Sequence, residues 1–256
     1  MIIIQSMNDL HSRPSGYLPR WLEPFLAEAA SAHRVVVLTG PRQVGKSTLL
    51  RQAAAFHGWR YVTLDEPAAL ALAARAPEDL WAGGPRLVLD EAQKAPALLP
   101  AIKRAVDEDP RRRFVLSGSA NLLLMQRVSE SLAGRAVHFT LAPMTLGETR
   151  KAAPPATLGK LLKGVWPEEG SRPARPPDPW PLIIRGFMPP LLRLPTPRVV
   201  IQWWEGYVAT YLERDLRQIS QVSSLEDYRR VMASLALRTG QILNQTTVAR
   251  DSRVPQ

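Results

Sequence analysis

The sequence predicts an α/β fold, in which a parallel β-sheet flanked by helices is followed by a separate helical region. Three observations indicate this. Short apolar runs rich in β-branched residues alternate with helical stretches over the first half of the chain. A glycine-rich turn separates the first apolar run from the helix that follows it. Farther on, twelve prolines lie between Pro154 and Pro197 and divide this half from the remainder.

Five apolar runs are the expected strands of the sheet. They cover residues 35–39, 61–64, 87–89, 114–116 and 137–141, and helical patterns follow the first four at 47–57, 68–80, 98–107 and 121–132. Strands that alternate with helices pair in parallel and are covered by helices on both faces. We therefore expect one α/β domain over residues 17–150.

The proline-rich stretch predicts a linker over residues 151–198, because proline lacks the amide donor that a helix interior or a central strand requires. Helical spacing returns at residue 199, where Val200, Trp204, Tyr207 and Val208 would share one face. A capping-box pattern at 223–226 predicts the start of a second helix. Residues 199–256 are therefore expected to form a separate helical region.

Composition excludes several classes of protein. The chain has no cysteine, which rules out disulfides, thiol catalysis and cysteine–zinc sites, and its four histidines are scattered. No apolar run approaches the roughly 20 residues of a membrane helix. These features favour a soluble, cytoplasmic protein.

The net charge of +10 is high for 256 residues. A basic surface attracts polyanions, so non-specific nucleic acid is one expected partner. A general preference for arginine in the coding sequence explains the charge equally well, and the charge alone does not choose between the two.

The glycine-rich turn matches the phosphate-binding P-loop pattern, G-x-x-x-x-G-K-[ST], and it lies between a strand and a helix as that pattern requires. Its backbone amides and the helix dipole would surround phosphate oxygens. The Lys46 side chain would reach the β- and γ-phosphates of ATP, and the Ser47 hydroxyl would ligate Mg²⁺. The expected nucleotide-binding residues are Gly40, Pro41, Arg42, Gln43, Val44, Gly45, Lys46, Ser47 and Thr48.

An acidic pair follows the third apolar run. Asp90 would emerge at the carboxyl end of a strand beside the P-loop, where its carboxylate can hold Mg²⁺. Glu91 would then orient and deprotonate the attacking water. Without the P-loop, the pair would equally fit the cap of the next helix.

Two further polar positions are candidates for catalysis. Ser117 or Ser119, after the fourth run, could sense the γ-phosphate, although Ser119 also fits a helix N-cap. Arg135 is a candidate arginine finger, acting in its own site or in that of a neighbouring subunit of a homo-oligomer. A surface arginine before a strand is almost as good an interpretation.

Taken together, the segments GPRQVGKST, LVLDEAQKAP, LSGSANLLL and SLAGR, with residues 61–67 and 143–148, resemble a bacterial and archaeal family of AAA-superfamily ATPases. The resemblance continues beyond the prolines, to YVATYLERDLRQIS and LALRTGQILNQTTVARD, and covers residues 17–254. It implies ATP as the nucleotide and a C-terminal region of unknown function that begins with a winged helix and continues into a restriction-nuclease-like fold.

This chain departs from the family pattern at two places. It has Arg-Gly-Phe-Met-Pro at 185–189 where the family has Gly-Gly-(Tyr/Phe)-Pro. It also ends at Gln256, where the recognition helix of the winged helix is expected to begin. Three hypotheses follow: an Mg-dependent ATPase, an ATP-dependent switch that controls a DNA or protein partner with little turnover, and a truncated remnant of a longer gene.

Overall fold

The computed structural model describes residues 16–119, 131–166, 178–212 and 224–254. The chain divides into two compact units, residues 1–201 and residues 202–256. Among the described residues, no helix has both the length and the apolar character needed to cross a membrane.

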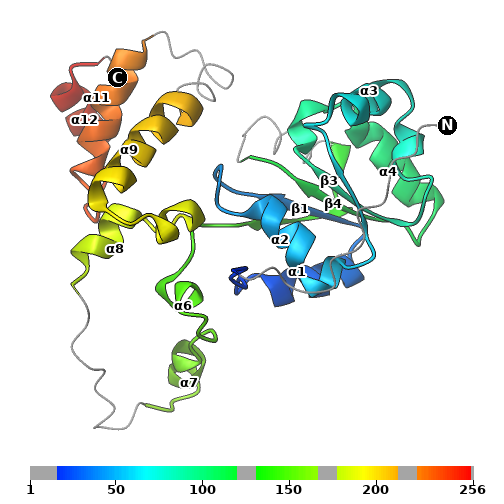
Figure 1. Ribbon diagram of the computed structural model, residues 1–256, viewed down its shortest axis with the longest axis horizontal. Coiled ribbons are helices and arrows are strands. Elements are labelled where there is room, and N and C mark those ends of the chain that lie inside the picture. Colours follow the sequence, from blue (N-terminus) through cyan, green and yellow to red (C-terminus); the bar gives the residue numbers. More distant parts are fainter. Residues whose placement is uncertain (1–15, 120–130, 167–177, 213–223, 255–256) are drawn as a thin grey trace. The chain divides into compact units, whose positions relative to one another are not determined.

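The first unit is built on a five-stranded parallel sheet (Figure 1). Its strands stand in the order β2-β3-β4-β1-β5. They are β1 (Val35–Thr39), β2 (Arg60–Thr63), β3 (Arg86–Asp90), β4 (Arg113–Ser117) and β5 (Ala136–Thr140). The five strands and the parallel α/β fold expected from the sequence are thereby confirmed.

Continuous apolar runs form the central strands because helices cover both faces of a parallel sheet. All five residues of β1 are buried. Side chains alternate along a strand, so Val35 and Val37 face one side, and Val36 and Leu38 the other. Helix α1 (Glu23–Ala32) packs against β1 and β4. Figure 1 shows α3 (Pro67–Arg75) and α4 (Leu98–Glu108) across the strands from α1 and α2 (Lys46–Gln52).

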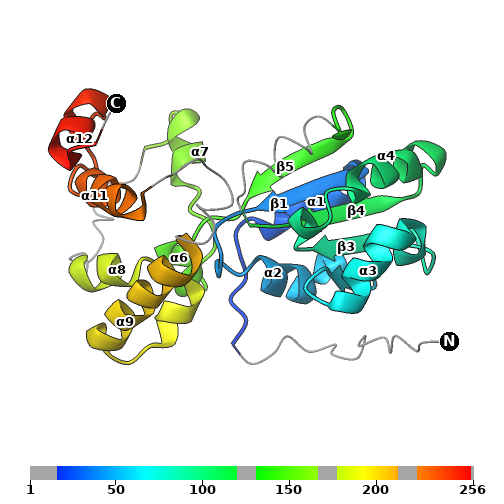
Figure 2. The same ribbon diagram turned by 90° about the horizontal axis from the view of Figure 1, so that it is seen from above.

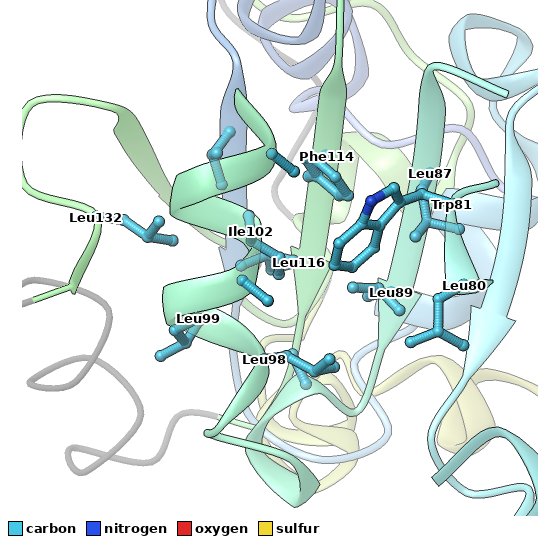
Figure 3. Close-up of a cluster of buried hydrophobic side chains, with 14 of the residues drawn as sticks. Leu80, Trp81, Leu87, Leu89, Leu98, Leu99, Ile102, Phe114, Leu116 and Leu132 are labelled. Atoms are coloured by element: carbon cyan, nitrogen blue, oxygen red, sulfur yellow. The ribbon is translucent and has the colours of Figure 1, made fainter. Parts of the chain in front are cut away.

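The largest buried cluster lies between α4 and strands β3 and β4 (Figure 3). Leu98 and Ile102 of α4, one turn apart, point toward Leu89, Leu116 and neighbouring side chains of the sheet. Trp81 and Phe114 meet edge to face, with ring centroids 5.3 Å apart. Truncation of a buried side chain such as Ile102 to alanine would cost about 2–5 kcal/mol of the free energy of unfolding. This packing fixes β3 and β4 beside β1.

Short helices occupy part of the segment expected to be a linker. They are α7 (Thr157–Leu162), α8 (Trp180–Arg185) and the 3₁₀ turn η4 (Pro189–Arg193), and a further short helix, α6 (Leu146–Thr149), precedes the segment. Prolines stand in the first turn of α8 and of η4, where a missing amide donor costs nothing. Met188 and Leu191 are buried, so this part of the segment is folded and packed and is not an extended linker.

The C-terminal part contains the expected helices. Helix α9 (Pro197–Tyr207) runs into a π-helical turn, Val208–Leu212, and α11 (Leu225–Ala236) packs with α12 (Gln245–Ser252). Figure 2 shows the α11 and α12 helices as neighbours. The Ser224 hydroxyl caps α11 by accepting a bond from the Asp227 amide, so the cap stands one residue later than the sequence pattern suggested. A winged helix in this region stays a prediction.

Candidate functional site

The loop between β1 and α2 has a backbone that favours glycine at two positions. Gly40 lies at φ 150° and Gly45, the N-cap of α2, at φ 97°. At Gly40 space is limiting as well, because a Cβ atom there would lie 2.3 Å from the Leu141 carbonyl oxygen. The chain therefore turns tightly at the carboxyl end of β1 and enters α2 at Lys46, as the P-loop pattern predicts.

The Lys46 side chain folds back across this loop. Its ammonium donates to the carbonyl oxygens of Gly40 at 2.9 Å and Pro41 at 2.8 Å, and the residue is only 6% exposed. Burial lowers the pKa of Lys46, while the nearby carboxylates of Glu91 and Asp90 oppose that shift. The loop thus holds a buried positive charge against the two acidic residues that end β3.

The other expected nucleotide-binding residues belong to the same loop and helix. Ser47 is half-buried and Thr48 is exposed, both in the first turn of α2. In the loop itself, Pro41 and Gln43 are exposed, Arg42 is half-buried and Val44 is buried.

Asp90 is buried at the end of β3 with both of its carboxylate oxygens hydrogen-bonded. Oδ1 accepts from the Glu91 amide at 3.1 Å, and Oδ2 accepts from the Tyr61 hydroxyl of the neighbouring strand β2. The Arg51 guanidinium of α2 lies over the Tyr61 ring, 4.4 Å from its centroid. Burial and the charge of Asp90 raise the pKa of Tyr61, so its hydroxyl stays protonated and donates to Asp90. Sequence reasoning assigned Tyr61 no role, although this polar aromatic residue begins a segment, 61–67, that carries the family resemblance.

Glu91 stands in a left-handed backbone conformation, at φ 57° and ψ 39°. For a residue with a side chain this costs about 1–3 kcal/mol and persists only where the surroundings enforce it. The Gln93 amide nitrogen donates to the Glu91 carboxylate and, at 3.4 Å, to the Ser119 hydroxyl beyond β4. Gln93 therefore joins the acidic pair to the next strand, a role that the sequence did not indicate.

The two candidate serines differ in their surroundings. Ser119 is 8% exposed and accepts the bond from Gln93, so it belongs to the Glu91 network. Ser117 is fully buried, and its hydroxyl has no hydrogen-bond partner among the described residues. Of the two positions, only Ser119 is linked to the acidic pair.

Arg135 lies where the strands begin, at the amino edge of the sheet, whereas the P-loop lies at the carboxyl edge, where the strands end. It precedes β5, whereas the P-loop follows β1, and the two strands are parallel and in register. Five residues of strand separate the two edges by about 16 Å, which exceeds the reach of an arginine side chain. The Arg135 guanidinium instead binds both carboxylate oxygens of Asp107, at 2.7 and 2.9 Å. The structure thus does not bring Arg135 to the P-loop of its own chain.

Two family models match parts of the chain. Residues 32–150 match a family model described as an AAA domain, and residues 178–256 match a domain of unknown function, DUF8612. Uncharacterized proteins of Mycobacterium tuberculosis and Mycobacterium bovis are each 30% identical to the chain over 223 residues. The match covers 87% of this chain but 45% of each relative, so the chain spans about half their length.

A solved structure shares the fold. The Walker-type ATPase of Pyrococcus abyssi aligns over 96% of this chain and 90% of its own, with a TM-score of 0.53 and 15% identity. At that identity the likeness shows the fold alone, a P-loop NTPase-like α/β fold.

Proposed function

Because the chain joins an AAA domain, a nucleotide-binding P-loop ATPase module, to a domain of unknown function, we propose that it binds ATP with Mg²⁺ and hydrolyses it to ADP and phosphate. One observation carries the proposal. The buried ammonium of Lys46 lies among the charges of Asp90 and Glu91 at the carboxyl edge of the sheet. Ligands of open α/β sheets bind at this edge.

The loop and Lys46 would bind the phosphates. The carbonyl oxygens of Gly40 and Pro41 hold the ammonium with bonds that phosphate oxygens can replace, since a charge-assisted bond to phosphate is stronger than one to a neutral carbonyl. Lys46 would then contact the β- and γ-phosphates while the loop amides surround them.

Ser47 and Asp90 fit a magnesium ion that arrives with the nucleotide. A carboxylate offers about four lone-pair sites, and the bonds from Glu91 and Tyr61 use two of those on Asp90. Among the described residues no group of three or more acidic or histidine side chains could hold a metal ion. Mg²⁺ needs no such group, because it takes one or two protein oxygens with phosphates and water. When bound, it would neutralise charge on the β- and γ-phosphates.

Glu91 would act on the attacking water. Glu91 is the residue after Asp90, the proposed metal ligand, and its carboxylate accepts a hydrogen bond from the Gln93 amide. We assign to Glu91 the role of orienting the water and accepting its proton as the bond from the γ-phosphorus to the bridging oxygen breaks. Ser119, on the other side of Gln93, is the better candidate of the two serines for sensing the γ-phosphate.

The test is a titration of the purified chain with Mg-ATP, combined with an assay of phosphate release. We expect saturable binding that requires Mg²⁺, and multiple turnovers of ATP. Binding without turnover would leave nucleotide binding intact and contradict hydrolysis, whereas the absence of binding would contradict the whole proposal.

The contact from Gln93 to Glu91 favours a second candidate function, an ATP-dependent switch. The Gln93 amide occupies the Glu91 carboxylate, so the attacking water would have to compete for it, and turnover would stay slow until a partner changes that contact. Measuring phosphate release with and without duplex DNA distinguishes the two functions, because a switch would be accelerated by its partner.

Non-specific nucleic acid and a second copy of the chain remain proposed partners. The charge of +10 favours contact with phosphate backbones, and we expect dissociation constants on the order of 10⁻⁴–10⁻⁶ M for such purely electrostatic binding. Fluorescence anisotropy on unrelated duplexes across a salt series checks this. Nanomolar, sequence-selective binding would instead indicate an element that reads bases.

A further inference from the structure

The P-loop is contacted by an arginine that precedes the matched AAA domain. Arg20 is 7% exposed, and its guanidinium donates three bonds. Nη1 donates to the Val44 carbonyl oxygen of the P-loop at 3.0 Å, and Nη2 to the Ala142 carbonyl oxygen at 2.7 Å. Nε donates to Glu148 Oε1 at 3.1 Å. The same side chain thus joins the P-loop to the segment after β5.

Glu148 holds this guanidinium in place. It is 4% exposed, and its carboxylate also accepts from the backbone amides of Trp21 and Thr145, each at 2.7 Å. Burial raises the pKa of Glu148, but the two amides and the Arg20 charge outweigh it and keep that pKa below its ordinary value. The carboxylate therefore stays ionised, and the pair is buried with its hydrogen bonds satisfied.

A close approach fixes the N-terminal segment on α6. Gly147 packs beneath the Trp21 ring, and a Cβ atom there would lie 2.3 Å from the ring. The Trp21 indole nitrogen donates to the Ala152 carbonyl oxygen at 2.9 Å. Arg20, the preceding residue, is thus presented to the P-loop by a backbone that is itself held at several points.

The bond to Val44 determines the direction of a P-loop amide. The Val44 carbonyl and the Gly45 N–H belong to one peptide plane, in which the two groups point in opposite directions. A guanidinium that holds the carbonyl on one side directs the Gly45 N–H to the other. It also polarises the peptide, which strengthens that N–H as a donor.

We propose that Arg20 is a positioning residue of the phosphate-binding loop, which orients the Val44–Gly45 peptide so that the Gly45 N–H meets a phosphate oxygen of the nucleotide. The inference rests on the proposed function, since it needs nucleotide at the P-loop. It extends the site to a residue that the family model, which begins at residue 32, does not include.

The matching test variant is Arg20→Lys, which keeps the charge but cannot reproduce the planar fork that reaches Val44, Ala142 and Glu148 at once. Arg34→Lys is the control. The Arg34 guanidinium also donates to a main-chain carbonyl, that of Val106, but at the amino edge of the same sheet. Circular dichroism and thermal melting report the fold of each variant.

The readouts are the affinity for Mg-ADP by calorimetry and the NMR amide shift of Gly45 on titration with Mg-ADP. In the parent, the Gly45 amide should shift strongly as the phosphate binds. In folded Arg20→Lys we expect affinity to fall roughly tenfold and the Gly45 response to diminish, as loss of a bond to a charged group predicts. Arg34→Lys should match the parent in both.

Two results would overturn the inference. The first is a folded Arg20→Lys variant with parental affinity and a parental Gly45 response. The second is a parent protein that binds Mg-ADP without a change in the NMR shift of its Gly45 amide. This measurement needs no variant, so it tests the inference even if Arg20→Lys fails to fold. Failure of the parent to bind nucleotide would instead overturn the proposed function, and this inference with it.

Discussion

The two edges of the sheet carry similar charged residues in different surroundings. At the carboxyl edge, Lys46 and Asp90 are buried, and Asp90 is held by Tyr61. At the amino edge, Arg135 pairs with Asp107, and Arg111 with Asp109, in positions that are exposed or only partly buried. Burying a charge is costly unless specific partners satisfy it, whereas an exposed pair needs none and contributes little.

Burial separates charges that bear on function from charges that do not. An exposed ion pair can be rearranged at little cost, so its presence indicates nothing about chemistry. At the carboxyl edge, a buried ammonium interacts with two carboxylates, and the backbone of Glu91 is left-handed. Such an arrangement persists only if the fold enforces it. We therefore expect substitutions at the carboxyl edge to change activity, and matched ones at the amino edge to leave it unchanged.

The largest effect is expected for Glu91→Gln. The change preserves size but removes the carboxylate that would accept the proton of water, so turnover should fall about 10²–10⁴-fold while Mg-ATP binding persists. Phosphate release and calorimetry measure the two quantities. Glu108→Gln, at the exposed end of α4, is the control and should keep parental turnover. Parental turnover in Glu91→Gln would mean that another group activates the water.

Lys46→Ala should weaken ATP binding by at least about tenfold, because it removes a charge-assisted contact to the phosphates. The fold should survive, since the hydrogen bonds of the ammonium to described residues go to carbonyls of the loop itself. Titration calorimetry measures the affinity, and Lys103→Ala on the exposed side of α4 is the matched control. Equal affinity in parent and Lys46→Ala would remove the P-loop from the proposed function.

Glu148 should make the free energy of unfolding of the first unit, residues 1–201, decrease at acidic pH. Because its pKa is lower in the folded chain than in the unfolded one, its contribution is complete above the ordinary carboxyl pKa of about 4.3. That contribution is lost as the pH falls through the lower, folded value. Urea unfolding between neutral pH and about pH 3 measures it.

Glu148→Gln provides the comparison for that measurement. It should lower the free energy of unfolding by about 1–3 kcal/mol at neutral pH, since a charged acceptor of three bonds becomes neutral. It should also show a shallower loss in acid than the parent. An equally steep loss in both proteins would assign the acid sensitivity to other carboxyls.

The smallest effect is expected for Arg135→Ala. The exposed pair with Asp107 lies at the edge opposite the P-loop, so turnover in dilute solution should match that of the parent. Phosphate release measured over a range of protein concentrations checks this. A loss of turnover that appears only at concentrations where the chain self-associates would show that Arg135 acts on a neighbouring subunit.

Local signals made the sheet and the phosphate-binding loop predictable. The run 35–39 is apolar at its first four positions, which is characteristic of a strand buried on both faces, and the observed strand has those bounds and is buried throughout. Gly40 and Gly45 stand where the backbone takes a positive φ, so the two glycines of the P-loop pattern indicate the turn that the loop makes. The position of Arg135 could also be predicted from the sequence. Arg135 precedes one parallel strand and the P-loop follows another, so the two lie at opposite ends of the strands.

The α/β fold, the P-loop at Lys46 and the acidic pair at the end of the third strand could be predicted from the sequence, because each depends on residues within a few positions of one another. Tertiary structure alone decided that Tyr61 holds Asp90, that Gln93 joins Glu91 to Ser119, and that Arg20 reaches Glu148 across 128 positions of sequence. These contacts depend on strand order and register, which bring distant segments together at one edge of the sheet. No short-range pattern encodes that arrangement.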